Sequence, residues 1–238
     1  MLFAMISVSL GLTTGCASSG SVDNDPFEGM NRKVSAFNQK SDEVFLVPIA
    51  QGYKKVLPQP VRNGIHNLIL NLREPYNVLN DLLQGQFRLA AQDTGRFLVN
   101  SILGCFGLND VASYMDLPRR REDFGQTLGV WGVPTGPHLV IPFLGPSNIR
   151  DLVGLVPDYS YGSLVSPSSS PENTVAWATG IVDARVQFLG LEEVIALQPD
   201  SYLFLRESYR QQRQSQILNN QVAEDQSDDA LLDELYEN

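Results

Sequence analysis

The chain carries few side chains of the kinds that perform acid–base or nucleophilic chemistry. His66 and His138 are its only histidines in 238 residues, they stand far apart, and each has apolar neighbours. The sequence contains none of the local patterns that mark zinc peptidases, dithiol redox centres, serine-hydrolase elbows or nucleotide-binding loops. We therefore expect both histidines to be structural, and the protein to be a non-enzyme with no catalytic residue, no metal site and no cofactor.

Cys16 is the residue best placed for covalent modification. The apolar stretch 1–14 is too short to span a bilayer and leads into small residues just before this cysteine, which is typical of a signal peptide. Small residues before a cysteine also resemble the lipobox of bacterial lipoproteins, in which the thiol is diacylated. The absence of Asp directly after Cys16 suggests, by the same resemblance, sorting to the outer membrane. A plain signal peptide with an incidental cysteine is the alternative.

Lipidation of Cys16 has a consequence for the second cysteine. The chain has only two cysteines, so Cys105 is then left without a partner for a disulfide. We expect Cys105 to be a small core residue.

The net charge of −10 is carried by the C-terminal end of the chain. Seven of the 27 acidic residues and none of the 17 Lys and Arg residues follow Arg213, so the part before it is close to neutral. No basic patch of the size that nucleic acids require is present, and we expect no nucleic-acid partner. The segment 216–238 is expected to be an acidic, disordered tail.

Helical periodicity predicts the elements that hold the rest of the chain together. Apolar residues recur at spacings of three, four and seven in five stretches, which we expect to be amphipathic helices. The stretches run over about residues 26–45, 61–72, 87–105, 172–189 and 199–214. Asp25 is expected to cap the first helix with Pro26 as its first residue, whereas Pro48 and Pro75 are expected to break the chain. The apolar faces fit either an ordinary globular core or contact with lipid, and periodicity does not separate the two.

The stretch 122–151 is different, because it holds five glycines and four prolines in thirty residues. Glycine costs about 1 and proline about 3 kcal/mol inside a helix, so no long helix is expected there. Its short apolar runs, 128–133 and 139–144, predict two extended pieces joined at 134–137 in a hairpin-like turn. An ordinary Gly/Pro-rich hairpin would account for this composition.

Several motifs in this order resemble the VacJ/MlaA family of outer-membrane lipoproteins. They are EDFGQTLG, WGV, LGPS and RD within 122–151, DPFEGMNR from Asp25, PQPVRNG from Pro58, NLREP from Asn71, and RFLVNSILG from Arg96. The resemblance covers residues from Asp25 to about Arg213. It implies a mainly α protein, a ring of amphipathic helices with a short Gly/Pro-rich hairpin-like insertion, embedded in the inner leaflet of the Gram-negative outer membrane.

The resemblance also implies a function and partners. Misplaced phospholipids of the outer leaflet would pass through a polar channel in the ring to MlaC, a periplasmic carrier, and a trimeric porin would hold the ring. The domain plan is then a lipoprotein signal peptide at 1–15, a lipidated tether at 16–25, a helical domain at 26–215 and the tail. Two rival readings are a soluble, periplasm-facing scaffold lipoprotein that binds protein partners, and a lipid hydrolase.

Six residues are candidates for the channel and its gating. Phe37 and Asn38 lie in the entry helix, which matters for function in the family. Arg150 and Asp151 are polar residues that could line the path, and Gly129 and Gly136 could let the Gly/Pro stretch move as a gate.

Two groups of arginines remain open to more than one interpretation. Arg119, Arg120 and Arg121 form a basic triplet that fits anionic headgroups or an ordinary solvated loop. The stripe in the last helix, Arg206, Arg210 and Arg213, fits lipid phosphates, a porin or water, with water as the default.

Overall fold

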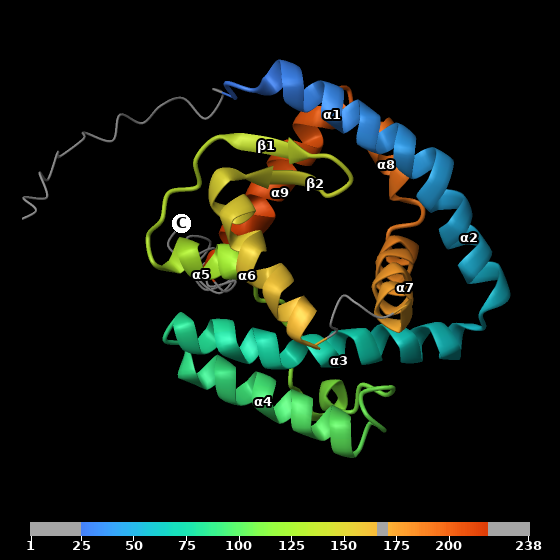
Figure 1. The fold of residues 1–238 in the computed structure, drawn as a ribbon, viewed down its shortest axis with the longest axis vertical. Coiled ribbons are helices and arrows are strands. Elements are labelled where there is room, and N and C mark those ends of the chain that lie inside the picture. The colour runs from blue at the N-terminus through green and yellow to red at the C-terminus, as the bar shows by residue number, and fades with distance from the viewer. Residues whose placement is uncertain (1–24, 166–170, 219–238) are drawn as a thin grey trace, which may run out of the picture.

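The structure, a computed structural model, describes residues 25–165 and 171–218, and its helices follow one another around a ring (Figure 1). The helical elements are α1 (Glu28–Ser41), the π-helical turn η1 (Asp42–Leu46), α2 (Val47–Val56), α3 (Gln59–Leu83), α4 (Phe87–Ile102), the 3₁₀ turn η2 (Ala112–Met115), α5 (Phe124–Val130), α6 (Ile149–Val165), α7 (Pro171–Gln187), α8 (Leu191–Ala196) and α9 (Ser201–Ile217). Strands β1 (His138–Ile141) and β2 (Gly145–Asn148) form an antiparallel hairpin in the ring. The expected helical ring with a short hairpin is confirmed. In the part of the chain that the structure describes, no helix is both long and apolar enough to cross a membrane.

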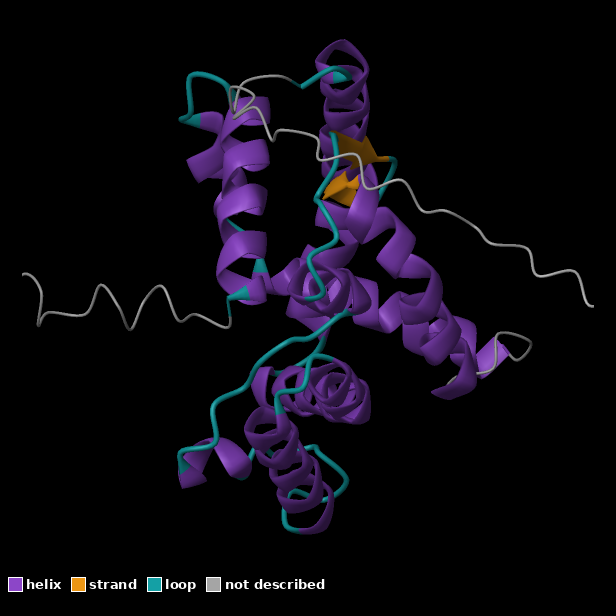
Figure 2. Cartoon of the chain, turned by 90° about the vertical axis from the view of Figure 1, so that its left-hand side faces the viewer, coloured by secondary structure: helices purple, strands orange, loops and turns teal. Residues whose placement is uncertain are grey.

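The ring is held closed by arginines that join segments far apart in the chain. Arg32 of α1 binds both carboxylate oxygens of Asp200, the N-cap of α9, at 3.1 and 2.8 Å. Arg185 of α7 binds both oxygens of Asp42 in η1 at 2.7 and 2.9 Å. Outside the ring, α4 packs along α3, and two views place α4 and η2 beyond α3 (Figures 1 and 2).

The first arc of the ring departs from the sequence-based expectation at both ends. The helix α1 begins only at Glu28, with Phe27 rather than Asp25 at the N-cap position, although Asp25 still accepts the N–H of Phe27 at 3.0 Å, a bond of the capping type. Pro48 does not break the chain, because it lies in the first turn of α2 directly after η1. A π-helical turn bonds to the fifth residue on, and this accommodates the missing N–H of the proline.

The helix α3 runs unbroken through Pro75, where an interruption was expected. An interior proline costs about 3 kcal/mol, and the packing of α3 against α4 outweighs it. The contact is polar on both sides. The buried residues of α3 are Asn71, Glu74, Tyr76, Asn77, Asn80 and Asp81. Those of α4 are Ala90, Asp93, Arg96 and Asn100.

The Gly/Pro-rich stretch does form a hairpin, but one segment later than expected. Residues 124–130 are helical, because Asp123 accepts the N–H of Gln126 at 2.9 Å and thereby caps α5. The strands pair from His138 with Asn148 to Ile141 with Gly145, so the turn lies at 142–144 rather than at 134–137. The chain reverses there through positive φ angles, 62° at Phe143 and 89° at Gly145.

The packing is inverted relative to that of a soluble globular protein. The largest fully buried side chains are all polar: Arg96, Gln126, Glu74, Asn31, Asn80, Thr127, Asp81 and Asp93. Large apolar side chains lie outside, with Leu197 82%, Phe106 81% and Val56 76% exposed. Soluble monomers rarely expose contiguous apolar patches larger than a few hundred Å². The apolar stripes of the helices therefore face outward.

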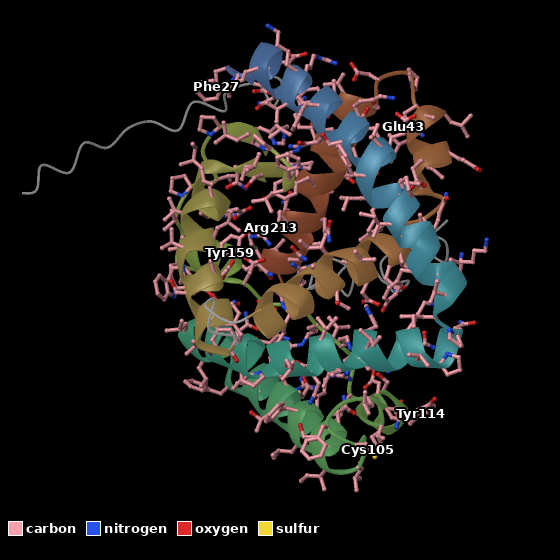
Figure 3. The ribbon with its side chains drawn as sticks, turned by 45° about the vertical axis from the view of Figure 1, so that its right-hand side comes forward. Phe27, Glu43, Cys105, Tyr114, Tyr159 and Arg213 are labelled. Carbon is pink, nitrogen blue, oxygen red and sulfur yellow. The ribbon has the colours of Figure 1, made fainter. Side chains whose placement is uncertain are left out.

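Cys105 shows where the expectation of an ordinary core was wrong. It was expected to be a small core residue, yet it is exposed in the loop after α4, at the outer end of the α4 layer together with Tyr114 (Figure 3). The reason is the inversion, because the apolar side of α4 and of the loop that follows it faces away from the ring.

Candidate functional site: a buried ionic network beside a basic pocket

Arg213 is the centre of a buried network that joins three elements. Its Nη1 and Nη2 donate to the two carboxylate oxygens of Asp123, before α5, at 2.6 and 2.8 Å. Its Nε donates to Asp151 of α6 at 2.9 Å. Asp151 also accepts from the Tyr209 hydroxyl and from Arg150, whose Nη2 lies 2.9 Å away. One arginine of α9 thus fixes the starts of α5 and α6.

The charges of this network are strongly stabilised in the folded protein. Burial alone would raise the pKa of Asp123, but the hydrogen bonds and the positive charge of Arg213 lower it to about 2. The pKa of Asp151 is lowered for the same reason, against the opposing effect of its burial. Both carboxylates are therefore ionised throughout the physiological range.

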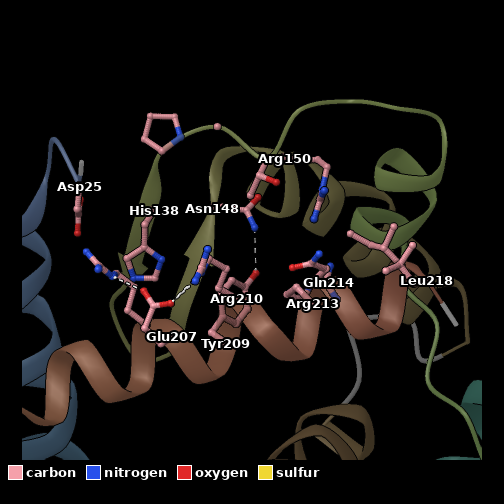
Figure 4. Close-up of a pocket in the computed structure, with 15 residues that line it drawn as sticks. Asp25, His138, Asn148, Arg150, Glu207, Tyr209, Arg210, Arg213, Gln214 and Leu218 are labelled. Atoms are coloured by element: carbon pink, nitrogen blue, oxygen red, sulfur yellow. Dashed lines mark hydrogen bonds and ion pairs between the residues drawn. The ribbon is translucent and has the colours of Figure 1, made fainter. Parts of the chain in front are cut away.

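A pocket of about 470 Å³ opens between the hairpin and α9 (Figure 4). Four arginines line it: Arg150 at the start of α6, and Arg206, Arg210 and Arg213 on α9. Glu207 partly balances them, because it accepts from Arg210 Nε at 2.9 Å and from Arg206 Nε at 3.2 Å. In Figure 4, Arg150 points from the hairpin side toward α9. The pocket is basic and offers guanidinium donors to an anion.

A second network lies between α3, α4 and the loop before α5. Arg120 Nη2 lies 3.2 Å from Asp81 and 3.0 Å from Asp93, and neither carboxylate has any exposed surface. Burial is the main cause that raises the pKa of Asp81 to about 7 and also raises that of Asp93, in both cases against the charge of Arg120. Asp81 therefore keeps its proton up to about neutral pH, and burial favours the neutral form of Asp93 as well.

A third group joins α4 to the loop that follows it. Arg96, which has no exposed surface, donates to Glu74 at 3.2 Å and to Asp110 at 3.0 Å. Asn100 donates to the same oxygen of Asp110 at 2.9 Å. Buried charges of this kind are costly unless they are paired and hydrogen-bonded, and here they are.

Phe37 and Asn38, two of the candidate channel residues, contact the turn of the hairpin. The Asn38 amide donates to the carbonyl of Ile141 at 2.9 Å and accepts the N–H of Phe143 at 2.8 Å. The rings of Phe37 and Phe143 meet edge to face with centroids 5.2 Å apart. The entry helix therefore holds the tip of the hairpin with both residues.

The other candidates gather at the basic pocket. Arg150 and Gly136 line it, and Asp151, which does not line it, accepts a hydrogen bond from Arg150. A Cβ at Gly129 would lie 3.0 Å from Arg150 Nη1 and 2.7 Å from a methyl carbon of Ile217. Gly136 has a φ of +69°, and a Cβ there would lie 3.0 Å from Ile149. Both glycines thus permit close packing; Cys16 lies outside the described residues.

Sequence reasoning missed the partners that make the network. Arg213 was assigned to water by default, yet it is mostly buried and doubly paired. Asp123 was read only as part of a motif. A signal existed in α9, where Arg206, Arg210 and Arg213 recur at helical spacing beside Tyr209, but spacing alone does not tell an inward face from an outward one.

The histidines take separate places. His66 Nδ1 lies 2.6 Å from Asp183 of α7 and so links α3 to α7. His138 lines the basic pocket, and burial lowers its pKa, so that its ring is neutral at pH 7. Among residues 25–165 and 171–218 no group of three potential ligands is arranged to hold a metal ion.

Fold and site together define a class of protein: a ring of helices that is apolar outside, ionic inside, and basic at a pocket in its wall. Comparison with known proteins agrees with that class. A family model described as MlaA lipoprotein matches residues 23–216, and the chain belongs to this family.

The relatives and a solved structure resemble the chain over most of its length. The intermembrane phospholipid transport system lipoprotein MlaA of Escherichia coli (strain K12) is 34% identical over 220 residues, which covers 89% of this chain and 87% of that protein. MlaA of Haemophilus influenzae is 31% identical over 234 residues, with coverage of 93% and 92%. A structure described as the basis for maintenance of bacterial outer membrane lipid asymmetry superposes with a TM-score of 0.72 at 33% identity, covering 82% of this chain and 99% of the other.

Proposed function

We propose that this chain removes mislocalised phospholipids from the outer leaflet of the outer membrane through a polar channel and passes them to a periplasmic carrier, thereby maintaining lipid asymmetry. The inverted packing is the observation that carries the proposal. Apolar side chains on the outside suit acyl chains. A polar interior replaces the hydrogen bonds that a headgroup loses on leaving water, a loss that otherwise costs several kcal/mol.

The membrane arrangement follows from the same family. Acyl chains on Cys16 anchor the protein, and residues 26–215 lie in the inner leaflet as one helical domain. A trimeric porin holds the ring, and MlaC receives the lipid. A periplasm-facing scaffold would instead bury its apolar stripes against one another, and the exposure of Leu197, Phe106 and Val56 argues against that alternative.

Within the ring, we assign the lipid path to the region of the basic pocket. Arg150 and Asp151 lie along it, and Gly129 and Gly136 let the Gly/Pro stretch move as its gate. Phe37 and Asn38 hold the tip of the hairpin and thereby set the resting position of that gate. Gly129→Ala and Gly136→Ala each place a methyl group against a packed neighbour and should reduce transport. Undiminished transport in both variants would count against the gate.

The decisive experiment measures phospholipid in the outer leaflet of a Gram-negative strain that lacks its own homologue. Expression of this chain should return the outer-leaflet phospholipid to the wild-type level. Cys16→Ser should fail to do so and should no longer fractionate with the outer membrane. If the chain reaches the outer membrane and the outer-leaflet phospholipid stays high, the proposed function is wrong.

A further inference from the structure

The arginine triplet after Pro118 contains two paired members and one without a partner. Arg119 Nη2 lies 2.9 Å from Asp110, and Arg120 contacts both carboxylates of the second network. The guanidinium of Arg121 makes no hydrogen bond and no ion pair to any residue within 25–165 and 171–218, and its side chain is exposed. This cation is therefore available to a ligand.

The main chain at Arg121 is fixed, although its guanidinium is not. Gln126 Nε2 donates to the Arg121 carbonyl at 2.9 Å. The buried amide of Asn77 on α3 donates to the Arg120 carbonyl at 3.3 Å and accepts the N–H of Glu122 at 3.1 Å. These three bonds hold the backbone on both sides of Arg121. A ligand that binds its side chain would have to order only that side chain, which lowers the entropic cost of binding.

A second arginine stands next to this position. Arg73 lies four residues before Asn77 on α3 and so shares the face of the helix against which the Arg121 backbone is clamped. Arg73 likewise makes no hydrogen bond or ion pair through its side chain to the described residues. Burial first, and then the positive charge of Arg73, lowers the pKa of Arg121. The positive charge of Arg73 thus acts on Arg121, and the carboxylates of Asp123 and Asp158 oppose its effect.

The space beside Arg121 has room and polar partners. A pocket of about 310 Å³ lies between the loop 119–122 and the end of α9, and it is lined by the triplet together with Glu122, Gln126, Gln212, Ser215 and Gln216. Arg121 is exposed and lines this pocket, so its side chain is accessible there. Burial raises the pKa of Glu122 to about 7, so its negative charge is partly removed at neutral pH.

We propose that Arg121, which lines this pocket, binds an oxyanion of the phosphate type there, with Arg73 on the adjoining face of α3 as the second cation. A guanidinium presents two parallel N–H donors that match phosphate oxygens, and an anion between two cations removes their mutual repulsion. The inference deepens the proposed function, on which it rests: the anion is the phosphodiester of a lipid headgroup in transit, or else free phosphate. The site is separate from the pocket lined by Arg150, with which it shares no residue.

The test is a titration of the full-length lipidated protein, labelled with ¹⁵N-arginine, in micelles of a non-ionic detergent. The probes are inorganic phosphate, soluble glycerophosphoglycerol and, as an uncharged control, glycerol. The Arg121 Nε–H signal is assigned by its loss in Arg121→Gln. It should move with the phosphodiester, and Arg73→Gln should weaken the apparent Kd about tenfold. Arg88→Gln is the matched control, because Arg88 on α4 is also exposed and without an ion pair in the described chain, and it should leave the Kd unchanged.

The outcomes separate the sources and the hypotheses. A shift with the phosphodiester supports a headgroup site, and a shift with inorganic phosphate alone supports an oxyanion site for free phosphate. If neither probe moves the Arg121 signal, or if Arg88→Gln weakens binding as much as Arg73→Gln does, the site is refuted. Outer-leaflet phospholipid in the complemented strain decides the proposed function independently, since a strain that is rescued without any Arg121 shift overturns only the anion site. Arg121→Lys, which keeps the charge without the two-pronged donor, should bind more weakly than wild type but more tightly than Arg121→Gln.

Discussion

Replacing Asp123 by Asn isolates the contribution of one buried charge to the stability of the ring. Asn caps a helix as well as Asp does, so α5 keeps its N-cap and only the charge facing Arg213 is lost. The pKa of Asp123 is about 2 in the folded protein against an ordinary 3.8. A difference of that size corresponds to about 2–3 kcal/mol. We expect Asp123→Asn to lower the free energy of unfolding by about this amount at pH 7.

The pH dependence follows from the sign of the change. The folded-state pKa of Asp123 lies below its unfolded-state value, so its stabilisation is complete above about pH 4 and is lost as the pH falls to about 2. The difference in unfolding free energy between wild type and Asp123→Asn should therefore be constant between about pH 7 and pH 5. It should then shrink toward zero at the acid end of the range.

Urea unfolding in non-ionic detergent, followed by far-UV circular dichroism at a series of pH values, measures this difference. Asp116→Asn is the control, because Asp116 is exposed and has a φ of 56°, which Asn also adopts readily. It should change the unfolding free energy by less than about 0.5 kcal/mol. A loss for Asp123→Asn no larger than that of the control, or a loss that persists unchanged at the lowest pH, would refute the view that Arg213 holds Asp123 ionised.

Four further outcomes are expected. Burial raises the pKa of Glu122 to about 7, so the folded protein loses stability as the pH rises through that value and the carboxyl group ionises. In the same unfolding assay, the free energy of unfolding of Glu122→Gln should exceed that of wild type by up to about 3 kcal/mol above pH 8 and by little at pH 4. Gly154→Ala places a Cβ 2.6 Å from the Gly125 nitrogen and should lower the stability in thermal unfolding by about 1–3 kcal/mol. The control is Gly52→Ala, whose Cβ would have no neighbouring atom within 4 Å; it should be neutral or raise the stability by up to about 1 kcal/mol. Asn38→Ala removes both hydrogen bonds to the hairpin turn, so it should lower the stability by about 1–3 kcal/mol and speed proteolysis at 142–144. Unchanged cleavage would show that the turn is stable without these two bonds. The protein without its acyl anchor should still need detergent to remain monomeric, and a compact monomer in plain buffer would contradict the exposure of the apolar stripes.

The helices could be predicted from the sequence because their apolar spacing is local information. The last two predicted stretches match α7 and α9 within about three residues at each end. The failures occur where distant contacts decide. Pro75 is tolerated because α4 packs against α3, and the hairpin turn moves to 142–144 because Asp123 caps α5 and α1 binds the turn through Asn38.

The candidate site could be predicted only in part for a similar reason. Arg150 and Asp151 are neighbours in the chain, so a motif contained both of them. Arg213, the partner of Asp151, also binds Asp123, which lies 90 positions away in sequence, and only the fold brings them together. No spacing rule connects such residues, because an ion pair between separate elements depends on how the elements pack.

The outward orientation of the apolar helix faces could also be inferred from the sequence, through the kinds of polar residue that each helix carries. Charged residues are rarely buried unless they are paired, and arginine, which is more weakly hydrated than lysine and donates in a planar fork, is the usual cation of buried ion pairs. All four lysines, Lys33, Lys40, Lys54 and Lys55, lie in α1 and α2, and the polar faces of α3 and α4 contain none. A helix whose polar face is made of amides, carboxylates and arginines without lysine is suited to burying that face and exposing the apolar one. Periodicity measures how strongly a helix is two-sided, but the identity of the polar residues indicates which side faces inward.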